Sequence, residues 1–257
     1  MTKIGVIGVG QMGSAIIKGL KKDATNKIIG ENPVNPRVSR LAEKLDFKLV
    51  HAIHDLINLD LDYVFLTTPA KITLQIIPEL INLDAKTTII SSVAGVGYNN
   101  LENILPNHSI IRIIPNTPVA INAGTIGLFI PANISKINAV KITHFLEQLG
   151  DVISVKEDQL SIVGTIGGCG PAFVDVFLDA LGDAGVLNGL PRNLANQLAA
   201  SMVKGSATLA SDSKIAPALL RDQVCSPGGT TIKGVTSLEA NGFRHTVIEA
   251  VNQANQN

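Results

Sequence analysis

The chain has 257 residues, enough for one large domain or two ordinary ones, and enough to bury a core without disulfides or structural metals. Its 21 basic and 21 acidic residues cancel and form no basic stripe, which argues against a nucleic-acid partner. Cys169 and Cys225 stand far apart in sequence and outside any C-x-x-C pair, so we expect no metal site.

The N-terminal residues run directly into a strand-like segment and lack the hydrophobic core and cleavage site of a signal peptide. Glycine, proline or a charged residue interrupts each apolar run before it reaches the length that spans a bilayer. We therefore expect a soluble, cytoplasmic protein without a membrane partner.

The first part of the chain alternates short aliphatic runs with amphipathic stretches. The runs that predict strands are 3–7, 27–30, 63–67, 88–91 and 109–114. The stretches that predict helices are 12–20, 37–45 and 72–83. This alternation indicates βαβ units, and hence an α/β domain with a mostly parallel, doubly wound sheet.

From Gln159 onward the sequence shows no convincing strand. Stretches rich in Ala, Leu and Val predict helices at 171–186, 192–210 and 239–252. Pro171 and Pro191 suit first helical turns, and Asn188-Gly189 suits the turn between two helices.

We therefore expect two domains, an α/β domain at 1–157 and an all-helical domain at 158–257. The later helices are rich in small residues, such as Ala195 and Ala199, and are apolar on more than one side. A domain of this size could bury such helices only partly against itself. We infer a homodimer formed through the helical domain; an ordinary helical core is the alternative.

A G-x-G-x-x-G motif follows the first apolar strand directly. Gly8 permits a tight turn, Gly10 lets the backbone approach a pyrophosphate, and Gly13 allows close packing of the following helix, whose free N–H groups suit an anion. In this context the motif predicts a dinucleotide site in a Rossmann-like domain rather than a structural glycine turn. The residues expected to contact the dinucleotide here are Ile7, Gly8, Val9, Gly10, Gln11, Met12 and Gly13.

The end of the second predicted strand carries two conflicting signals. Glu31 lies at about the spacing at which an acidic residue binds the ribose 2′-hydroxyl of NAD. Arg37, with Asn32 and Asn35, could instead hold the 2′-phosphate of NADP. A solvated acid in a loop is the structural alternative for Glu31.

Later strand ends supply further candidates, because open α/β sheets bind ligands at the carboxyl ends of their strands. Thr67-Thr68-Pro69 and Ala94-Gly95 follow the third and fourth strands. Asn116 stands between two prolines after the fifth strand, where its amide could face the nicotinamide carboxamide. A plain turn would also place an asparagine at this position.

Two glycine-rich segments of the second part resist a purely structural interpretation. Residues 164–173 place glycines just before a predicted helix. Ser226-Pro227-Gly228-Gly229-Thr230-Thr231 brings three hydroxyl groups close to exposed backbone donors at another helix start. That arrangement suits a carboxylate, which a helix N-terminus binds without lysine or arginine. The alternative is an ordinary helix cap.

The stretches 112–118, RIIPNTP, and 222–231, DQVCSPGGTT, resemble the most diagnostic motifs of pyrroline-5-carboxylate reductases. The similarity covers almost the whole chain. It implies a Rossmann-like domain, an all-helical dimerisation domain, and an active site where the two meet across subunits. It also implies reduction of 1-pyrroline-5-carboxylate to L-proline, the last step of proline biosynthesis, by NAD(P)H, with NADPH favoured. The imine is then the small-molecule partner, and the homodimer could form part of a higher oligomer.

The resemblance also suggests roles for single residues. The backbone around Gly229, Thr230 and Thr231, beside Ser226, would hold the substrate carboxylate. The Thr231 hydroxyl would lie near the ring nitrogen as polariser or proton relay. Further positions implied are Ala94, Gly95 and Asn116 on the nicotinamide side, Glu157 and Gln223 near substrate or cofactor, and His54 near the adenosine.

The chain departs from the family pattern at two places. Thr67-Thr68-Pro69 replaces the usual Val-Lys-Pro, and the lost lysine weakens the case for tight NADP binding. Gly168, Cys169 and Phe173 stand in a segment that is usually Ser-Gly-Ser-Gly-Pro-Ala-Tyr, so polar groups near the substrate are missing.

Two other functions compete with this interpretation. β-Hydroxyacid dehydrogenases share the glycine motif and a helical second domain, but they use a lysine as base, and 171–186 contains no lysine. A non-catalytic protein that senses nucleotides or binds a partner is the second alternative.

Overall fold

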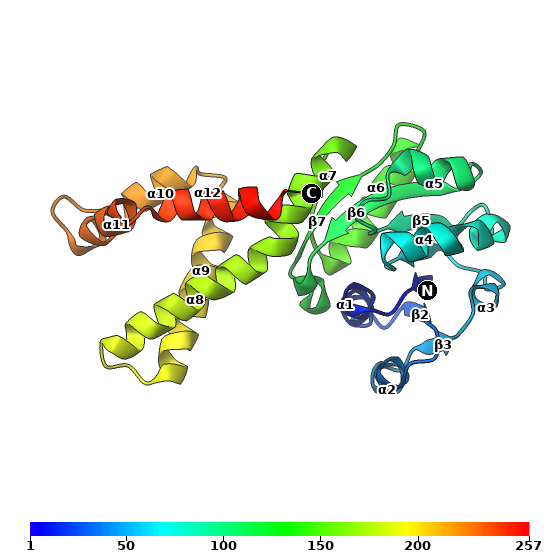
Figure 1. Cartoon of the computed structure of the whole chain (residues 1–257), viewed down its shortest axis with the longest axis horizontal. Helices are drawn as coiled ribbons and strands as arrows, with labels where there is room; N and C mark the ends of the chain where they lie inside the picture. The colour runs from blue at the N-terminus through cyan, green and yellow to red at the C-terminus, as the bar shows by residue number, and fades with distance from the viewer. Residues whose placement is uncertain (257) are drawn as a thin grey trace. The chain divides into compact units, whose positions relative to one another are not determined.

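The computed structural model describes residues 1–256 and separates into two compact units, Met1–Gly168 and a second that begins at Cys169 (Figure 1). The first unit is an α/β domain, and the described residues of the second form helices joined by turns, with no strand among them. The predicted fold class, a doubly wound α/β domain followed by a helical domain, is confirmed.

One eight-stranded sheet forms the centre of the first unit. Its strands are β1 (Thr2–Ile7), β2 (Asn26–Glu31), β3 (Lys48–Val50), β4 (Tyr63–Leu66), β5 (Thr88–Ser91), β6 (Ser109–Pro115), β7 (Gly124–Phe129) and β8 (Gly150–Ser154). Their spatial order is β3-β2-β1-β4-β5-β6-β7-β8, and only the β6–β7 pair is antiparallel. Because the chain runs outward from β1 first in one direction and then in the other, β1 and β4 mark the switch point where such sheets bind ligands.

Helices cover both faces of this sheet. They are α1 (Gln11–Leu20), α2 (Pro36–Leu45), α3 (Ile53–Ile57), α4 (Ala70–Ile76), α5 (Tyr98–Ile104), α6 (Lys136–Leu146) and α7 (Leu160–Gly164). Short 3₁₀ turns at Ile77–Asn82, Thr117–Ile121, Glu147–Leu149 and Glu157–Gln159, and a π-helical turn at Thr165–Cys169, complete the unit.

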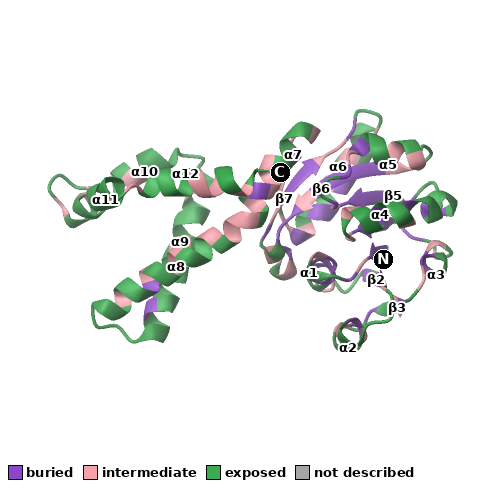
Figure 2. Ribbon diagram, in the orientation of Figure 1, coloured by how far each residue is buried: buried purple, intermediate pink, exposed green. Residues whose placement is uncertain are grey.

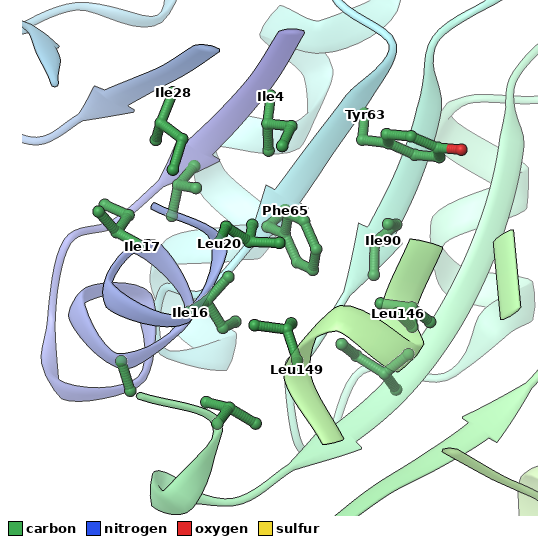
Figure 3. Close-up of a cluster of buried hydrophobic side chains, with 14 of the residues drawn as sticks. Ile4, Ile16, Ile17, Leu20, Ile28, Tyr63, Phe65, Ile90, Leu146 and Leu149 are labelled. Carbon is green, nitrogen blue, oxygen red and sulfur yellow. The ribbon is translucent and has the colours of Figure 1, made fainter. Parts of the chain in front are cut away.

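Two hydrophobic clusters lie on the two faces of the sheet, because successive side chains of a strand point to opposite faces. Ile4 and Val6 of β1 belong to the cluster that α1, α2 and α6 cover, and Ile7 belongs to the cluster on the side of α3 and α5. Figure 3 shows the first cluster, in which Leu20 of α1 and Phe65 of β4 are both fully buried. The sheet is thus buried on both sides, and its carboxyl edge is left to bind a ligand.

The structure differs from the sequence predictions at three strands and one helix of this unit. The short β3, the glycine-interrupted β7 and the largely exposed β8 were not predicted, since none carries a long aliphatic run. The helix predicted at 72–83 is divided: α4 ends at Ile76 and a 3₁₀ turn follows. Pro78 lies in that turn and has no N–H with which to continue an α-helix.

The second unit consists of α8 (Gly170–Leu187), α9 (Arg192–Ser213), α10 (Pro217–Gln223), α11 (Thr230–Ala240) and α12 (Phe243–Ala254). The predicted turn between α8 and α9 is present, with Gly189 at a φ of +94°. Ala195 and Ala199 are the buried residues of α9, and a Cβ on Gly185 would lie 2.7 Å from the Cβ of Ala195. Small residues therefore let these two helices pack closely.

One helix prediction in the later part of the chain is wrong. The stretch 239–252 is not one helix, because α11 ends at Ala240 and Gly242, at a φ of +72°, turns the chain into α12. The helix predicted at 171–186 is confirmed as α8. The glycines before it lie within helical turns themselves, so Glu157–Leu187 forms one helical run of 31 residues. By length and composition alone this run could cross a membrane, contrary to the prediction that glycine and proline would interrupt it.

Most residues of the second unit are exposed or partly exposed (Figure 2), and many of the exposed ones are large and apolar. Val176 of α8 is 73% exposed and Leu187 is 87% exposed, and Ile248 of α12 is 58% exposed. An apolar groove of about 420 Å³ runs between α8, α9 and α12, with Phe173, Phe177 and Phe243 among its lining residues. Exposed apolar surface of this extent is typical of a surface that another protein or a membrane covers.

Candidate active site

The predicted glycine motif joins β1 to α1 as a tight turn. Gly8 has a φ of +89°, which disfavours any side chain. A Cβ on Gly13 would lie 2.3 Å from the carbonyl oxygen of Gly8, so α1 packs on the turn only through a glycine. A Cβ on Gly10 would meet no atom within 4 Å, and no side chain caps α1 at this residue. The open backbone at Gly10 and the first N–H groups of α1 thus fit a pyrophosphate.

A pocket of about 220 Å³ opens beside this turn at the carboxyl edge of the sheet. It is lined by Gly8, Gly10, Glu31, Asn32, Pro33, Ile53, Thr67, Thr68, Pro69, Ile72 and Ile76. The structure therefore brings together predicted cofactor residues from the ends of β1, β2 and β4. The isoleucines were not predicted as site residues, since nothing in the sequence distinguishes them from core residues.

Glu31 is the last residue of β2 and is only 6% exposed. Its carbonyl oxygen accepts the Gly8 N–H at 2.9 Å, which fixes the turn against β2. Burial raises the pKa of the Glu31 carboxyl, and Glu79 raises it further while His51 opposes both. The alternative of a solvated acid in a loop is therefore wrong.

The residues after β2 hold the glycine turn from the other side. Asn32 accepts the Val9 N–H at 3.0 Å through Oδ1, and the Arg37 Nη2 donates to the Val9 carbonyl oxygen at 2.7 Å. Asn35 caps α2 by accepting the Arg37 N–H at 3.0 Å. Arg37 is exposed, so its remaining N–H groups are open to solvent or to a phosphate.

Thr67-Thr68-Pro69 closes the third side of the pocket. Thr67 Oγ1 contacts the carbonyl oxygens of Ile7 and Gly8 at 2.9 and 2.6 Å. Thr68 Oγ1 lies 2.8 Å from Thr73 Oγ1, and Pro69 precedes α4. These residues shape the turn and place no positive charge beside it.

Two predicted nicotinamide-side positions have different surroundings. Ala94 and Gly95 are exposed in the loop after β5, and Gly95 has a φ of +79°. Asn116 is 7% exposed, donates to the Gly167 carbonyl oxygen at 3.0 Å and accepts the Thr125 N–H at 2.8 Å. The structure thus shows the Asn116 amide bound within the protein, as in the plain-turn alternative.

Glu157 also makes contacts inside the first unit rather than facing an open pocket. Its Oε1 accepts the Tyr98 N–H at 2.5 Å and lies 2.7 Å from Arg112 Nη1. Arg112 is 8% exposed and was not predicted as a site residue. A single charged residue in the otherwise aliphatic β6 was the signal that could have identified it.

The predicted substrate segment forms the turn between α10 and α11. Gly228 has a φ of +68°, and the Gly229 N–H donates to the Ser226 carbonyl oxygen at 3.0 Å. No side chain caps α11, so the capping alternative for these hydroxyl residues is not what the structure shows. Thr230 and Thr231 are exposed in the first turn of α11, and Gln223 is exposed at the end of α10.

His54 is the remaining predicted cofactor residue. It lies in α3 with a side chain 73% exposed, and its Nε2 is 3.0 Å from Asp55 Oδ1. The neighbouring Ile53, rather than His54, lines the pocket. No cluster of three or more metal-binding side chains occurs among residues 1–256.

A glycine turn at the switch point of a doubly wound sheet, with a pocket at its carboxyl edge, defines a Rossmann-like dinucleotide-binding protein. Residues 3–95 match the family model described as NADP oxidoreductase, coenzyme F420-dependent, and 157–257 match the model described as pyrroline-5-carboxylate reductase dimerisation. The chain belongs to the pyrroline-5-carboxylate reductase family.

Full-length relatives show this membership. The chain is 33% identical to pyrroline-5-carboxylate reductase of Synechocystis sp., covering 98% of this chain and 95% of the relative. It is equally 33% identical to the Escherichia coli enzyme, covering 97% and 94%. The solved structure of Plasmodium falciparum pyrroline carboxylate reductase with NADP bound is similar at a TM-score of 0.85 and 28% identity, covering 99% of this chain and 96% of that one.

Proposed function

We propose that this chain reduces 1-pyrroline-5-carboxylate to L-proline with NADPH, the last step of proline biosynthesis. Family membership along the whole chain supports the reaction. The observation that carries the proposal is the uncapped start of α11 behind the turn at Gly228 and Gly229, which offers a carboxylate backbone donors and hydroxyl groups.

The first turn of α11 would bind the substrate carboxylate. The N–H groups of Thr230 and Thr231 point out of the helix start, where the helix dipole favours an anion. A Cβ on Gly229 would lie 2.3 Å from Ser226 Oγ, so only glycine lets the serine hydroxyl sit against this turn. Lysine and arginine are not needed for such a site.

NADPH, when bound, supplies the hydride that the imine carbon accepts. The Thr231 hydroxyl would polarise the ring nitrogen or relay a proton to it, which completes the amine. Because an iminium is electrophilic by itself, the residues need mainly to orient the two reactants. The absence of lysine from α8 argues against the lysine-based chemistry of β-hydroxyacid dehydrogenases.

NADPH, rather than NADH, is the proposed preferred cofactor. Arg37 supports it, since its exposed guanidinium lies at the glycine turn beside Asn32. Buried Glu31 opposes it, because a carboxylate repels a 2′-phosphate. The preference therefore depends on the balance between these two side chains, with Asn35 fixing the backbone at Arg37.

The protein is proposed to act as a homodimer through its helical unit. The match of 157–257 to a dimerisation model and the exposed apolar side chains of α8 and α12 support this arrangement. Association of dimers into a higher oligomer and a cytoplasmic location belong to the same proposal, and light scattering and cell fractionation would test them.

An assay of NADPH oxidation tests the reaction. Oxidation is expected only when 1-pyrroline-5-carboxylate is added. Thr231→Val should reduce kcat about tenfold to a hundredfold, while Thr231→Ser, which keeps the hydroxyl, should retain most of it. Unchanged turnover in Thr231→Val would exclude the proposed role of the hydroxyl. NADPH binding without oxidation in the wild type would instead favour a nucleotide sensor.

A further inference from the structure

Arg112 is a buried charge on an inner strand of the sheet. It lies in β6 opposite Ser91 of β5 and Phe129 of β7, in a strand otherwise lined by isoleucines. Its side chain is 10% exposed, whereas that of its partner Glu157 is 31% exposed. A charge in such a place needs a partner, and the ion pair at 2.7 Å provides one.

The same two side chains bind both ends of one loop. Arg112 Nη2 donates to the carbonyl oxygen of Val93, at 3.5 Å, and Glu157 accepts the N–H of Tyr98, at 2.5 Å. The residues between these ends include exposed Ala94 and Gly95. The ion pair is therefore hydrogen-bonded to the loop 93–98 at its start and at its end.

The loop 93–98 lies on the side of the sheet edge where the nicotinamide half of a dinucleotide would bind. The pocket beside Glu31 and Asn32 lies at the end of β2, which is where the adenosine ribose binds in such folds. A dinucleotide that starts there and crosses the glycine turn after β1 continues over β4 and β5. Neighbouring strands are about 4.8 Å apart, so the loop after β5 lies about 10 Å beyond the glycine turn.

We propose that Arg112 is a positioning residue that, through Glu157, holds the loop 93–98 in the conformation that receives the nicotinamide end of the cofactor. The inference rests on the proposed use of a nicotinamide dinucleotide by this chain. Arg112 itself does not touch the reactants; it acts through the backbone of Val93 and Tyr98.

Two features argue that the pair serves more than stability. Replacing a buried ion pair by apolar residues is often neutral for stability, so such a pair is a weak stabiliser. The Nε of Arg112 is moreover buried without a hydrogen-bond partner, which a cluster built for stability alone would avoid. The hydrogen bonds of the pair instead go to the Val93 carbonyl oxygen and the Tyr98 N–H, at the two ends of the loop.

Binding of two probes separates positioning from a general structural role. NADPH carries the nicotinamide, whereas 2′-phospho-ADP-ribose ends before it. In Arg112→Met combined with Glu157→Gln, which removes both charges but keeps an acceptor for Tyr98, we expect the Kd of NADPH to rise about tenfold. The Kd of 2′-phospho-ADP-ribose should stay within about twofold, because the adenosine pocket is untouched.

Arg112→Lys and Lys86→Met complete the set. Arg112→Lys keeps the positive charge, but a lysine cannot contact Glu157 and Val93 together. It should therefore weaken NADPH binding less than the double variant does. If the double variant fails to fold, Arg112→Lys still tests the proposal. Lys86→Met, which removes the exposed pair with Asp60, should change neither Kd.

The proposal would be overturned if both probes weakened together, or if NADPH binding stayed unchanged in the double variant and in Arg112→Lys. A wild-type protein that binds NADPH but does not reduce 1-pyrroline-5-carboxylate would contradict the proposed function alone. The comparison of the two probes would still decide the role of Arg112 in that case.

Discussion

Arg37 and Val9 are joined by a hydrogen bond of 2.7 Å from the guanidinium to the backbone carbonyl oxygen, which ties α2 to the glycine turn. Asn32 accepts the N–H of the same valine. Arg37 and Asn32, which are proposed to bind the 2′-phosphate of the cofactor, are thus also hydrogen-bonded to the glycine turn that would bind its pyrophosphate. Cofactor choice and loop geometry are therefore coupled.

Arg37→Ala should raise the KM for NADPH about tenfold and the KM for NADH much less, because only the former loses a charge-assisted contact. Steady-state kinetics with both reduced cofactors measure this difference. Arg40→Ala removes a second exposed arginine of α2 and should leave both values unchanged. Equal increases for NADPH and NADH in Arg37→Ala would show that the arginine serves the loop alone.

The glycines of the turn should respond differently to alanine. Gly13→Ala places a Cβ 2.3 Å from the Gly8 carbonyl oxygen and should destabilise the free protein by about 1–3 kcal/mol. Gly10→Ala fills open space, so the thermal stability of the free protein should be retained while NADPH binding weakens. Thermal unfolding and NADPH titration measure the two effects, and retained NADPH affinity in Gly10→Ala would refute a dinucleotide at this place.

Burial of Glu31 should make stability depend on pH. Its pKa is raised in the folded protein, so the folded state holds the proton more tightly than the unfolded state. Stability attributable to this group should therefore fall as pH rises from the usual glutamate pKa through the raised one. Glu31→Gln should lack this component, which unfolding of the cofactor-free protein across that interval would reveal. Parallel pH profiles for wild type and variant would contradict the effect.

The exposed apolar face of α8 should hold the homodimer together. Val176 is 73% exposed and lines the apolar groove, so Val176→Glu should shift the protein toward monomers in light scattering. Ile137→Glu is a matched control, since Ile137 is 82% exposed on α6 of the first unit. A Val176→Glu protein that remained dimeric at low micromolar concentration would place the interface elsewhere.

Much of the fold follows from local patterns. The strand at 88–91 and the alternation of aliphatic runs and amphipathic helices were predicted from the sequence, because burial on both faces produces nearly continuous aliphatic strands. Strands β7 and β8 were missed, since Gly124, Gly127 and Gly150 weaken their pattern. The break between α11 and α12 depends on one left-handed glycine, Gly242, which helical periodicity does not reveal.

The site could be predicted only in part, for a physical reason. Glycine is required where the backbone has a positive φ or where a Cβ would not fit. The turn at Gly8 and the close helix packing at Gly13 could therefore be predicted from the sequence alone. Hydrogen bonds of Asn116 and Glu157 go to partners 45 or more residues away in sequence, at Gly167 and Arg112. Such contacts leave no local pattern, and only the structure shows that these polar side chains are bound within the protein.

Transfer of deuterium tests the central claim most directly. The chain is incubated with 1-pyrroline-5-carboxylate and NADPH that carries deuterium at the transferred position of the nicotinamide, and the product is analysed by mass spectrometry. The account predicts L-proline with one deuterium at C5, the former imine carbon. Proline without deuterium, or no proline while NADPH is bound, would contradict it.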